Sequence, residues 1–176
     1  MITRLTVAMI FCVAGAWAAA WSSAVEVCQE PERCVSYRAR LSGDYLVIEV
    51  THQAGWHTIA MDNKRRADEK LAGKQSLGVD APTEVRLSQG LELAGPWLQS
   101  PPKDASKPEL LWFTWTFEKQ ALLAAKVRRT GTGYAQIGIS GQACTETTCK
   151  KIDLTISLPL ANAPAEVDLK PLVAVR

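Results

Sequence analysis

Hydrophobic and polar residues alternate most regularly in two segments near the end of the chain. The apolar positions of the two segments are Ala135, Ile137, Ile139, Ile152, Leu154, Ile156 and Leu158. A period of two predicts β-strands that each bury one face. Because only residues 141–151 separate the two segments, we expect an antiparallel hairpin with this connection at its end.

Three earlier segments show the same preference for strands. Tyr45 to Val50 is rich in residues that favour β-structure, Thr83 to Leu87 alternates, and Leu111 to Phe117 interleaves Trp and Phe with Thr. Turn residues separate these segments, and no regular succession of strands and helices is visible. The pattern favours an all-β fold, a sandwich of antiparallel sheets, over an α/β fold.

Other segments are expected to be helical or irregular. Asp62 to Leu71 has a candidate N-cap, dense charge and a following Gly73, which predicts a short exposed helix. Glu118 to Lys126 is rich in Ala and Leu and fits either a second short helix or a buried strand. Gly95 to Pro108 contains four prolines, which predicts a long loop. Residues 161–176 are weakly patterned and are expected to form a tail, partly disordered.

The first twenty residues resemble a secretory signal peptide. Arg4 supplies a positive charge, Leu5 to Ala16 is apolar, and Ala18 to Ala20 offers small residues for cleavage. The apolar run falls short of the roughly 20 residues that a membrane-spanning helix needs. We therefore expect residues 1–20 to be removed and the mature protein to be periplasmic or secreted.

Charge and cysteine content limit the kinds of partner and of bond that we expect for this protein. The net charge of +2 comes from intermixed basic and acidic residues, without the long basic run that binds phosphate backbones, so a nucleic-acid partner is not expected. Loss of Cys12 with the signal peptide leaves Cys28, Cys34, Cys144 and Cys149 in an oxidising compartment. Four cysteines allow three pairings. Short loops favour Cys28 with Cys34 and Cys144 with Cys149, and a crossed pairing stays open.

The pair Cys144 and Cys149 is a candidate for redox chemistry. A disulfide that closes so short a loop removes little entropy from the unfolded chain, less than the about 3 kcal/mol given for a 15-residue loop. Since the predicted strands already hold the two residues together, the bond could open without unfolding the domain. We expect the charges of Lys150 and Lys151 to lower the pKa of the Cys149 thiol, while Glu146 opposes them.

Other interpretations of these residues compete with thiol exchange. A purely structural disulfide is the commonest fate of cysteines in exported domains. A metal site joining the two pairs is disfavoured, because their spacing lies at or beyond that of usual zinc ligands. His52 and His57, the only histidines, are expected to be ordinary sheet or loop residues. No catalytic triad or carboxylate pair is apparent, so hydrolysis has no support.

Several motifs resemble the N-terminal domain of the thiol:disulfide interchange protein DsbD family. They are Gly55-Trp56-His57, the segment from Asn63 to Gly78, Pro82-Thr83-Glu84, Gly95-Pro96-Trp97 and, most specifically, GQACTETTC from Gly141 to Cys149. The resemblance covers roughly residues 37–160. It implies an immunoglobulin-like fold without a bound cofactor, in which the domain takes electrons from a membrane partner and reduces periplasmic disulfide proteins.

The resemblance also implies roles for individual residues. Cys144 and Cys149 would be the redox pair, with Cys149 forming the mixed disulfide with a partner. The family shields its cysteines with a mobile loop, which places Trp97 as a candidate lid. One departure is that Lys150, Lys151 and Ile152 stand where many relatives have prolines. The membrane-embedded and thioredoxin-like portions of DsbD are not represented, so we expect a separate protein to act as reductant.

Together these observations predict four parts and two alternative functions. The parts are a signal peptide (1–20), an N-terminal segment (21–36) with a structural Cys28–Cys34 bridge, an immunoglobulin-like β-sandwich (37–160) with one or two short helices in loops, and a C-terminal tail (161–176). The first function is thiol-disulfide exchange, as a protein-disulfide reductase or a component of an interchange chain. The second is a non-catalytic binding or assembly module in which both disulfides are structural.

Overall fold

The computed structural model describes residues 21–29, 32–76, 78, 80–161 and 166–176, without the side chains of residues 28, 29 and 32. The predicted signal peptide, residues 1–20, lies outside the described residues. Among these, no helix is both long and apolar enough to cross a membrane.

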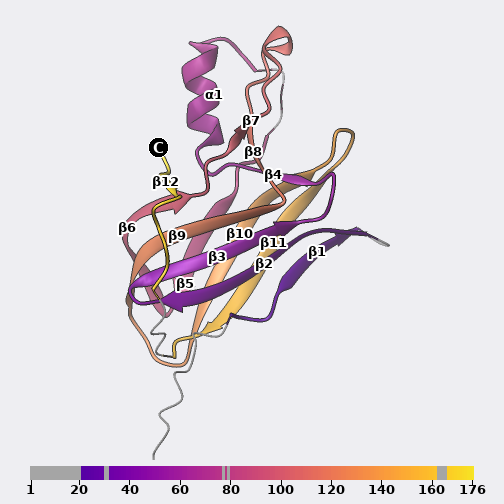
Figure 1. The fold of residues 1–176 in the computed structure, drawn as a ribbon. Helices are drawn as coiled ribbons and strands as arrows, with labels where there is room; N and C mark the ends of the chain where they lie inside the picture. The colour runs from indigo at the N-terminus through magenta and orange to yellow at the C-terminus, as the bar shows by residue number, and fades with distance from the viewer. Residues whose placement is uncertain (1–20, 30–31, 77, 79, 162–165) are drawn as a thin grey trace, which may run out of the picture.

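Two antiparallel sheets make up the fold (Figure 1). The strands of the first sheet, in spatial order, are β1 (Val25–Gln29), β2 (Glu32–Ser42), β3 (Tyr45–His52), β9 (Gln120–Arg129), β6 (Leu91–Gln99) and β12 (Val173–Ala174). Those of the second are β11 (Cys149–Pro159), β10 (Tyr134–Cys144), β4 (His57–Ile59), β8 (Trp115–Glu118) and β7 (Lys103–Asp104), with β5 (Glu84–Gln89) also paired to β10. The helices are α1 (Asn63–Leu71) and a short 3-10 helix (Pro108–Leu110).

The core lies between the inner faces of the two sheets. Its largest fully buried apolar side chains include Tyr37, Leu46, Ile48, Leu123, Ile137, Ile139, Ile152 and Ile156. The alternating residues of the two late segments therefore face the core, as their period predicted. The predicted all-β immunoglobulin-like sandwich with short helices in loops is confirmed.

The segment Glu118 to Lys126, for which the sequence allowed either a helix or a buried strand, belongs to strands. Residues 120–129 form β9, which lies between β3 and β6 in the middle of the first sheet. Ala121, Leu123, Ala124 and Ala125 are all buried, so both faces of this strand are covered. A strand buried on both faces loses its alternation, which is why its sequence resembles that of a helix.

The prediction that Gly95 to Pro108 form a loop is wrong for the first half of this segment. Residues 95–99 complete β6, and Lys103 and Asp104 form β7. The prolines were expected to prevent pairing, but the register between β6 and β9 shifts between Leu93 and Trp97, and Pro96 lies within that irregularity. A proline is tolerated at a bulge because no ladder hydrogen bond from its nitrogen is needed there.

The boundaries predicted at residues 36 and 161 are not boundaries of the sandwich. β2 runs through residue 36, and β1 pairs with it from Val25 opposite Tyr37. At the other end, residues 166–176 pass in front of the first sheet in Figure 1 and end in β12, which pairs with Leu98 and Gln99 of β6. The N-terminal segment and the C-terminal tail thus belong to the same sheet as the central strands.

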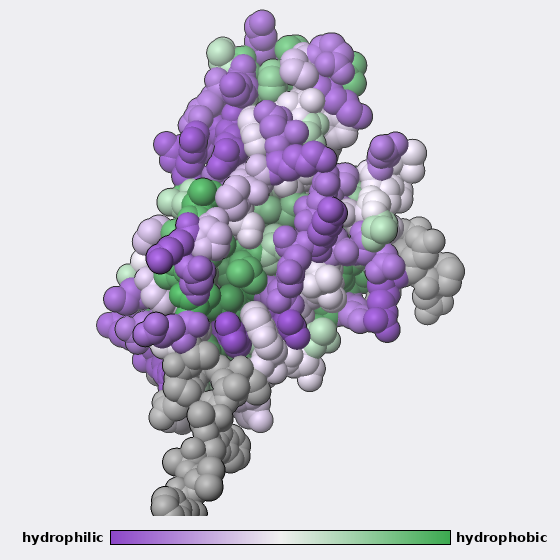
Figure 2. Space-filling view, in the orientation of Figure 1, coloured by the Kyte–Doolittle hydropathy of each residue, from purple (hydrophilic) through white to green (hydrophobic). Residues whose placement is uncertain are grey.

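The helix α1 is fixed to the sandwich at its first turn. Asp62, directly before the helix, is buried and accepts hydrogen bonds from Arg66 Nε and Gln99 Nε2, both at 2.8 Å, and from the Arg176 backbone at 3.3 Å. Burial opposes ionisation of this carboxyl, but these donors hold its pKa below the usual range. The rest of the helix is largely exposed and carries charged side chains, which form the hydrophilic surface around α1 in Figure 2.

Strand β10 changes partner along one edge at Gly141. Gln136 to Ser140 pair with β5, and Ala143 and Cys144 pair with β4. Gly141, between the two, has a φ of 146°, and a Cβ there would lie 3.0 Å from the Pro82 carbonyl oxygen. A side chain at this position would therefore be strained and crowded, so the change of partner depends on glycine.

We expect Gly141→Ala to destabilise the protein by about 1–3 kcal/mol, because it forces alanine into a sparsely populated backbone conformation. Urea unfolding followed by circular dichroism measures the loss. Gly138→Ala is the matched control in the same strand, since a Cβ there meets its nearest atom at an ordinary 3.8 Å. Equal stability of the two variants would show that Gly141 is not required.

Candidate functional site

The cysteine pair lies at the end of the β10–β11 hairpin, as predicted. Cys144 ends β10, Cys149 begins β11, and the two are paired in register and joined by a disulfide. The turn between them is closed by a hydrogen bond of 2.8 Å from the Thr145 nitrogen to the Thr148 carbonyl. The Thr145 hydroxyl also accepts hydrogen bonds from the backbone nitrogens of Thr147 and Thr148. The turn is therefore ordered by its own contacts.

The two sulfur-bearing residues differ in exposure. Cys149 is exposed, whereas Cys144 is only 4% exposed. Attack on a disulfide by an external thiolate, or by one of these thiols on a partner, requires an accessible sulfur. The arrangement gives Cys149 access to other proteins and keeps Cys144 behind it.

A row of directly paired residues extends from the disulfide across the second sheet. Cys149 pairs with Cys144, Cys144 with His57 of β4, and His57 with Glu118 of β8. Residues that pair directly in antiparallel strands project from the same face of the sheet. The four side chains therefore lie along one face, on four neighbouring strands.

The adjacent row shows which face this is. Ala143, Thr58 and Phe117 each lie one position away from the row and are also paired with one another. All three are buried, and Ala143 and Phe117 belong to the core. Since side chains alternate along a strand, the disulfide, the imidazole and the carboxylate lie on the face of the sheet that points away from the core.

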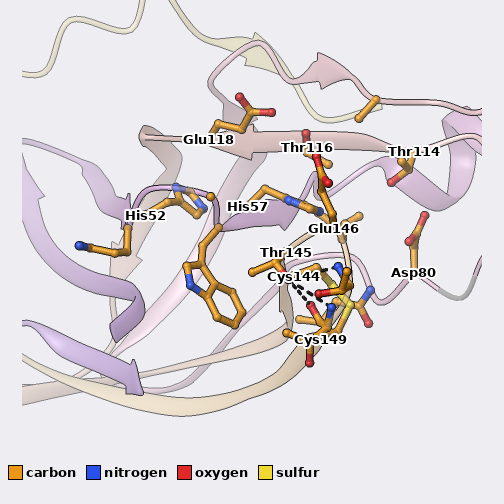
Figure 3. Close-up of a pocket in the computed structure, with 18 of the residues that line it drawn as sticks. His52, His57, Asp80, Thr114, Thr116, Glu118, Cys144, Thr145, Glu146 and Cys149 are labelled. Carbon is orange, nitrogen blue, oxygen red and sulfur yellow. Dashed lines mark hydrogen bonds between the residues drawn. A yellow bond between two sulfur atoms is a disulfide. The ribbon is translucent and has the colours of Figure 1, made fainter. Parts of the chain in front are cut away.

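These residues line a pocket of about 1470 Å³ (Figure 3). Besides the row itself, its lining includes Trp56, Asp80, Trp112 and the turn residues Thr145 to Thr148. Indole rings and polar groups thus share one cavity with the disulfide. Such a mixture of apolar walls and a few polar groups is typical of binding sites.

One wall of the pocket is set by close packing of Trp112. Its Nε1 donates a hydrogen bond of 3.0 Å to Asp80 Oδ2. A Cβ on Gly78 would come within 2.2 Å of the Trp112 ring, so glycine is needed for the ring to lie there. Asp80 also accepts a longer hydrogen bond, of 3.4 Å, from Asn63 at the start of α1. The wall is thereby connected to the helix.

The two histidines have different environments. His52 Nε2 lies 2.9 Å from Thr58 Oγ1, and its Nδ1 lies 3.3 Å from the Lys119 carbonyl oxygen. Burial lowers the pKa of His52 to about 4, so its ring is neutral at physiological pH. It is the ordinary sheet residue that the sequence indicated.

His57 differs because charged groups surround it. Burial lowers its pKa most, the negative charges of Glu118 and Asp80 raise it, and Lys103 lowers it, with a net result below the usual histidine value. Glu118 in turn forms an ion pair of 2.9 Å with Lys103. The expectation that His57 is an unremarkable loop or sheet residue overlooked its place beside Cys144. His57 belongs to the Gly55-Trp56-His57 motif, but only the strand register shows that it pairs with Cys144.

Trp97, the candidate lid, is not at the disulfide. It lies in β6 of the first sheet, paired with Ala125 and packed against the core, and it does not line the pocket. The prediction assumed that residues 95–108 form one loop, whereas pairing with β9 holds Trp97 in the other sheet. The tryptophans that share the pocket with the disulfide are Trp56 and Trp112.

The two lysines next to Cys149 in sequence are not equivalent in space. Lys150 pairs with Ala143, which belongs to the row on the core side, so its side chain leaves β11 on the face opposite to Cys149. Lys151 is on the Cys149 face, but its Nζ forms an ion pair of 3.0 Å with Asp153. Neither lysine lines the pocket. Their effect on the Cys149 pKa stays a prediction.

Of the two cysteines in the predicted Cys28–Cys34 bridge, the structure describes only the side chain of Cys34. Cys34 is fully buried, next to the core. Cys28 lies in β1 with its backbone opposite Arg33, and its side chain is outside the described residues. The bridge therefore stays a prediction. In the described part of the chain, no group of three or more His, Cys, Asp or Glu residues is arranged to hold a metal ion.

Comparison with solved structures identifies the fold. The N-terminal periplasmic domain of ScsB from Proteus mirabilis aligns with a TM-score of 0.58 and 16% identity, over 87% of this chain and 56% of that one. The chain therefore shares the fold of this ScsB domain. It spans just over half the length of the ScsB chain.

A second similar structure is the N-terminal domain of DsbD from Neisseria meningitidis in the reduced form. It has a TM-score of 0.41 and 9% identity, over 80% of this chain and 89% of that one. A scan of protein-family models finds no match. A search of curated proteins likewise finds no similar sequence.

In the reduced protein we expect iodoacetamide to modify Cys149 at least about 10-fold faster than Cys144, because only an accessible thiolate reacts readily. Peptide mass spectrometry after timed quenching measures both rates. In urea the two rates should converge, which provides the control. Equal rates in the folded protein would contradict the division into an outer and an inner cysteine.

Proposed function

We propose that this domain carries out thiol-disulfide exchange in the periplasm through Cys144 and Cys149. It passes electrons between a membrane-embedded or thioredoxin-like reductant and other periplasmic disulfide proteins. The observation that carries the proposal is a disulfide between one exposed and one buried cysteine, at the end of a hairpin whose strands are paired along their length. The ScsB-like fold supports it as an analogy.

The exchange begins and ends at Cys149. In the reduced domain, the Cys149 thiolate attacks a partner disulfide, a mixed disulfide forms, and one partner sulfur leaves as a thiolate. The Cys144 thiolate then attacks the Cys149 sulfur, which releases the second partner sulfur and restores the Cys144–Cys149 bond. The partner gains two electrons and the domain loses two. Reduction by a donor thiol runs through the same steps in reverse.

The sandwich can remain folded throughout this cycle. From Tyr134–Pro159 to Ala143–Lys150, β10 and β11 are paired at every position, so the disulfide is only the last of many links between them. Opening the bond therefore frees the sulfurs but not the strands. The electrons reside on the sulfurs, so the proposal requires no bound cofactor.

The location follows from the predicted signal peptide, residues 1–20, and agrees with the periplasmic origin stated for the ScsB domain. Partners would be proteins with exposed disulfides or thiols. The pocket beside Cys149 offers indole rings and carboxylates for contact with the partner surface around its cysteine.

We expect the Cys144–Cys149 bond of the folded protein to have a reduction potential above about −300 mV. Structural disulfides typically have reduction potentials below that value. Equilibration with glutathione or dithiothreitol buffers, followed by thiol alkylation and mass spectrometry, measures the potential. Circular dichroism in the same samples should stay unchanged. If mild reductant leaves the bond closed, or opens it only as the domain unfolds, the disulfide is structural and the binding-module alternative holds.

We also expect Cys144→Ser to accumulate a mixed disulfide with a periplasmic thioredoxin-like protein, because the inner sulfur that would resolve it is missing. Non-reducing electrophoresis detects the complex, and its loss after reduction identifies the bond. Cys149→Ser is the matched control and should trap far less. Equal trapping by both variants would contradict the assignment of Cys149 as the attacking residue.

A further inference from the structure

The exchange requires a proton acceptor that neither cysteine provides. Cys144 must lose its proton before it can attack the mixed disulfide, yet it is almost fully buried, away from solvent bases. Burial disfavours the charged thiolate form of a cysteine. A base within the protein would remove this obstacle.

We propose that His57 is this base: it takes the proton of Cys144 in the step that resolves the mixed disulfide, and Glu118 stabilises the resulting imidazolium. The inference rests on the proposed function and assigns residues to it beyond the two cysteines.

The geometry supports this assignment through strand register. Cys144 and His57 are direct partners on β10 and β4, and the Cβ atoms of such partners lie about 4.5–5.5 Å apart. An imidazole ring on that spacing can reach the neighbouring sulfur. His57 and Glu118 are direct partners in the same way on β4 and β8. All three residues line the same pocket, where Figure 3 shows His57 between the strand of Glu118 and the cysteine pair.

The charges around His57 favour transient protonation. Glu118 and Asp80 stabilise the imidazolium, while burial and Lys103 oppose it, and the net pKa lies below the usual value. His57 is therefore neutral and able to accept a proton at pH 7. Other titratable groups that line the pocket are His52, Lys107, Lys119 and Glu146. The ring of His52 is held by Thr58 and the Lys119 carbonyl, so it is not placed for this task.

Bonds, protons and electrons are all accounted for in the proposed step. The S–H bond of Cys144 breaks and its proton moves to an imidazole nitrogen of His57. The Cys144 thiolate attacks the Cys149 sulfur, the new Cys144–Cys149 bond forms, and the Cys149–partner bond breaks with both electrons going to the partner sulfur. The imidazolium then returns its proton to the departing thiolate or to water. The oxidant is the partner disulfide.

The test isolates the resolving step with dithiobis(nitrobenzoate), whose released thiolate absorbs visible light. Reduced protein releases one thiolate when Cys149 attacks the reagent, in a phase that depends on reagent concentration. It releases a second when Cys144 resolves the mixed disulfide, in a phase that does not. Cys144→Ser identifies the second phase by losing it. Stopped-flow measurements from pH 5 to pH 9 give the rate of each phase.

In the wild-type protein the second phase should rise through a midpoint below about pH 6.5 and then level off, because it follows ionisation of His57. In His57→Gln it should be at least about 30-fold slower at pH 7, since only about 3% of a free thiol with a pKa of about 8.5 is ionised there and burial of Cys144 lowers that fraction further. The rate should rise again as the pH increases toward the pKa of the Cys144 thiol. A purely structural defect would not be reversed by raising the pH.

Glu118→Gln supplies an independent measurement. Loss of its charge should move the midpoint of the second phase to lower pH. The pKa of His57, followed by nuclear magnetic resonance, should fall by the same amount. Glu92→Gln is the matched control, because Glu92 is also an exposed carboxylate paired with a basic residue, Arg128, but lies in the first sheet. Its profile should match the wild type.

The outcomes separate the two proposals. If the wild-type protein shows no concentration-independent second phase, the exchange function itself fails. If that phase is present but His57→Gln leaves its pH profile unchanged, only the role of His57 is overturned. Should His57→Gln fail to fold, Glu118→Gln decides, and an unmoved midpoint overturns the inference.

Discussion

The pairing of β10 with three other strands is the constraint on which the site depends. β11 pairs with one edge of β10 along its full length, while β5 and then β4 occupy the other edge. The change from β5 to β4 takes place at Gly141, where the positive φ and the close approach to Pro82 would strain and crowd a side chain. This junction brings His57 beside Cys144, and β8 extends the same row to Glu118.

The same pairing supports the proposed reactivity of the disulfide. The bond joins residues that the hairpin already holds together, so it contributes little to the free energy of unfolding. The strands are paired at every position between the disulfide and Tyr134–Pro159, and Cys149 is exposed. These two features are the ones that the proposed exchange requires. Function depends on the site and not on the fold, so the fold shared with ScsB does not by itself assign this use.

The region around α1 supports the wall of the pocket that contains Trp112. Asp62 accepts hydrogen bonds from Arg66, Gln99 and the Arg176 backbone, which joins the helix to β6 and to the end of the chain. Asn63 contacts both Asp80 and the backbone of Trp115, so the first helical turn also positions the pocket lining and β8. Residues distant in sequence thereby fix the position of Trp112 relative to the second sheet.

The sequence by itself determined the features that arise from local interactions. The alternation in residues 134–158 requires two strands, their short connection requires a hairpin, and the hairpin brings Cys144 to Cys149. The candidate N-cap, dense charge and following glycine predicted α1 correctly, although Asp62 forms no side-chain capping hydrogen bond and the left-handed residue directly after the helix is Ala72. Where a strand is buried on both faces, as in β9, the alternation disappears, and the sequence could not distinguish strand from helix.

Only the tertiary structure decided which residues surround the disulfide. Lys150 adjoins Cys149 in sequence but leaves the strand on the opposite face, and Trp97 belongs to the other sheet. His57 and Glu118 carry no local pattern that connects them to the cysteines. Their place follows from the register of β4 between β10 and β8, which is set by long-range strand pairing and by the glycine that permits it. Neighbours across a sheet are chosen by that register, and no nearby stretch of sequence encodes it.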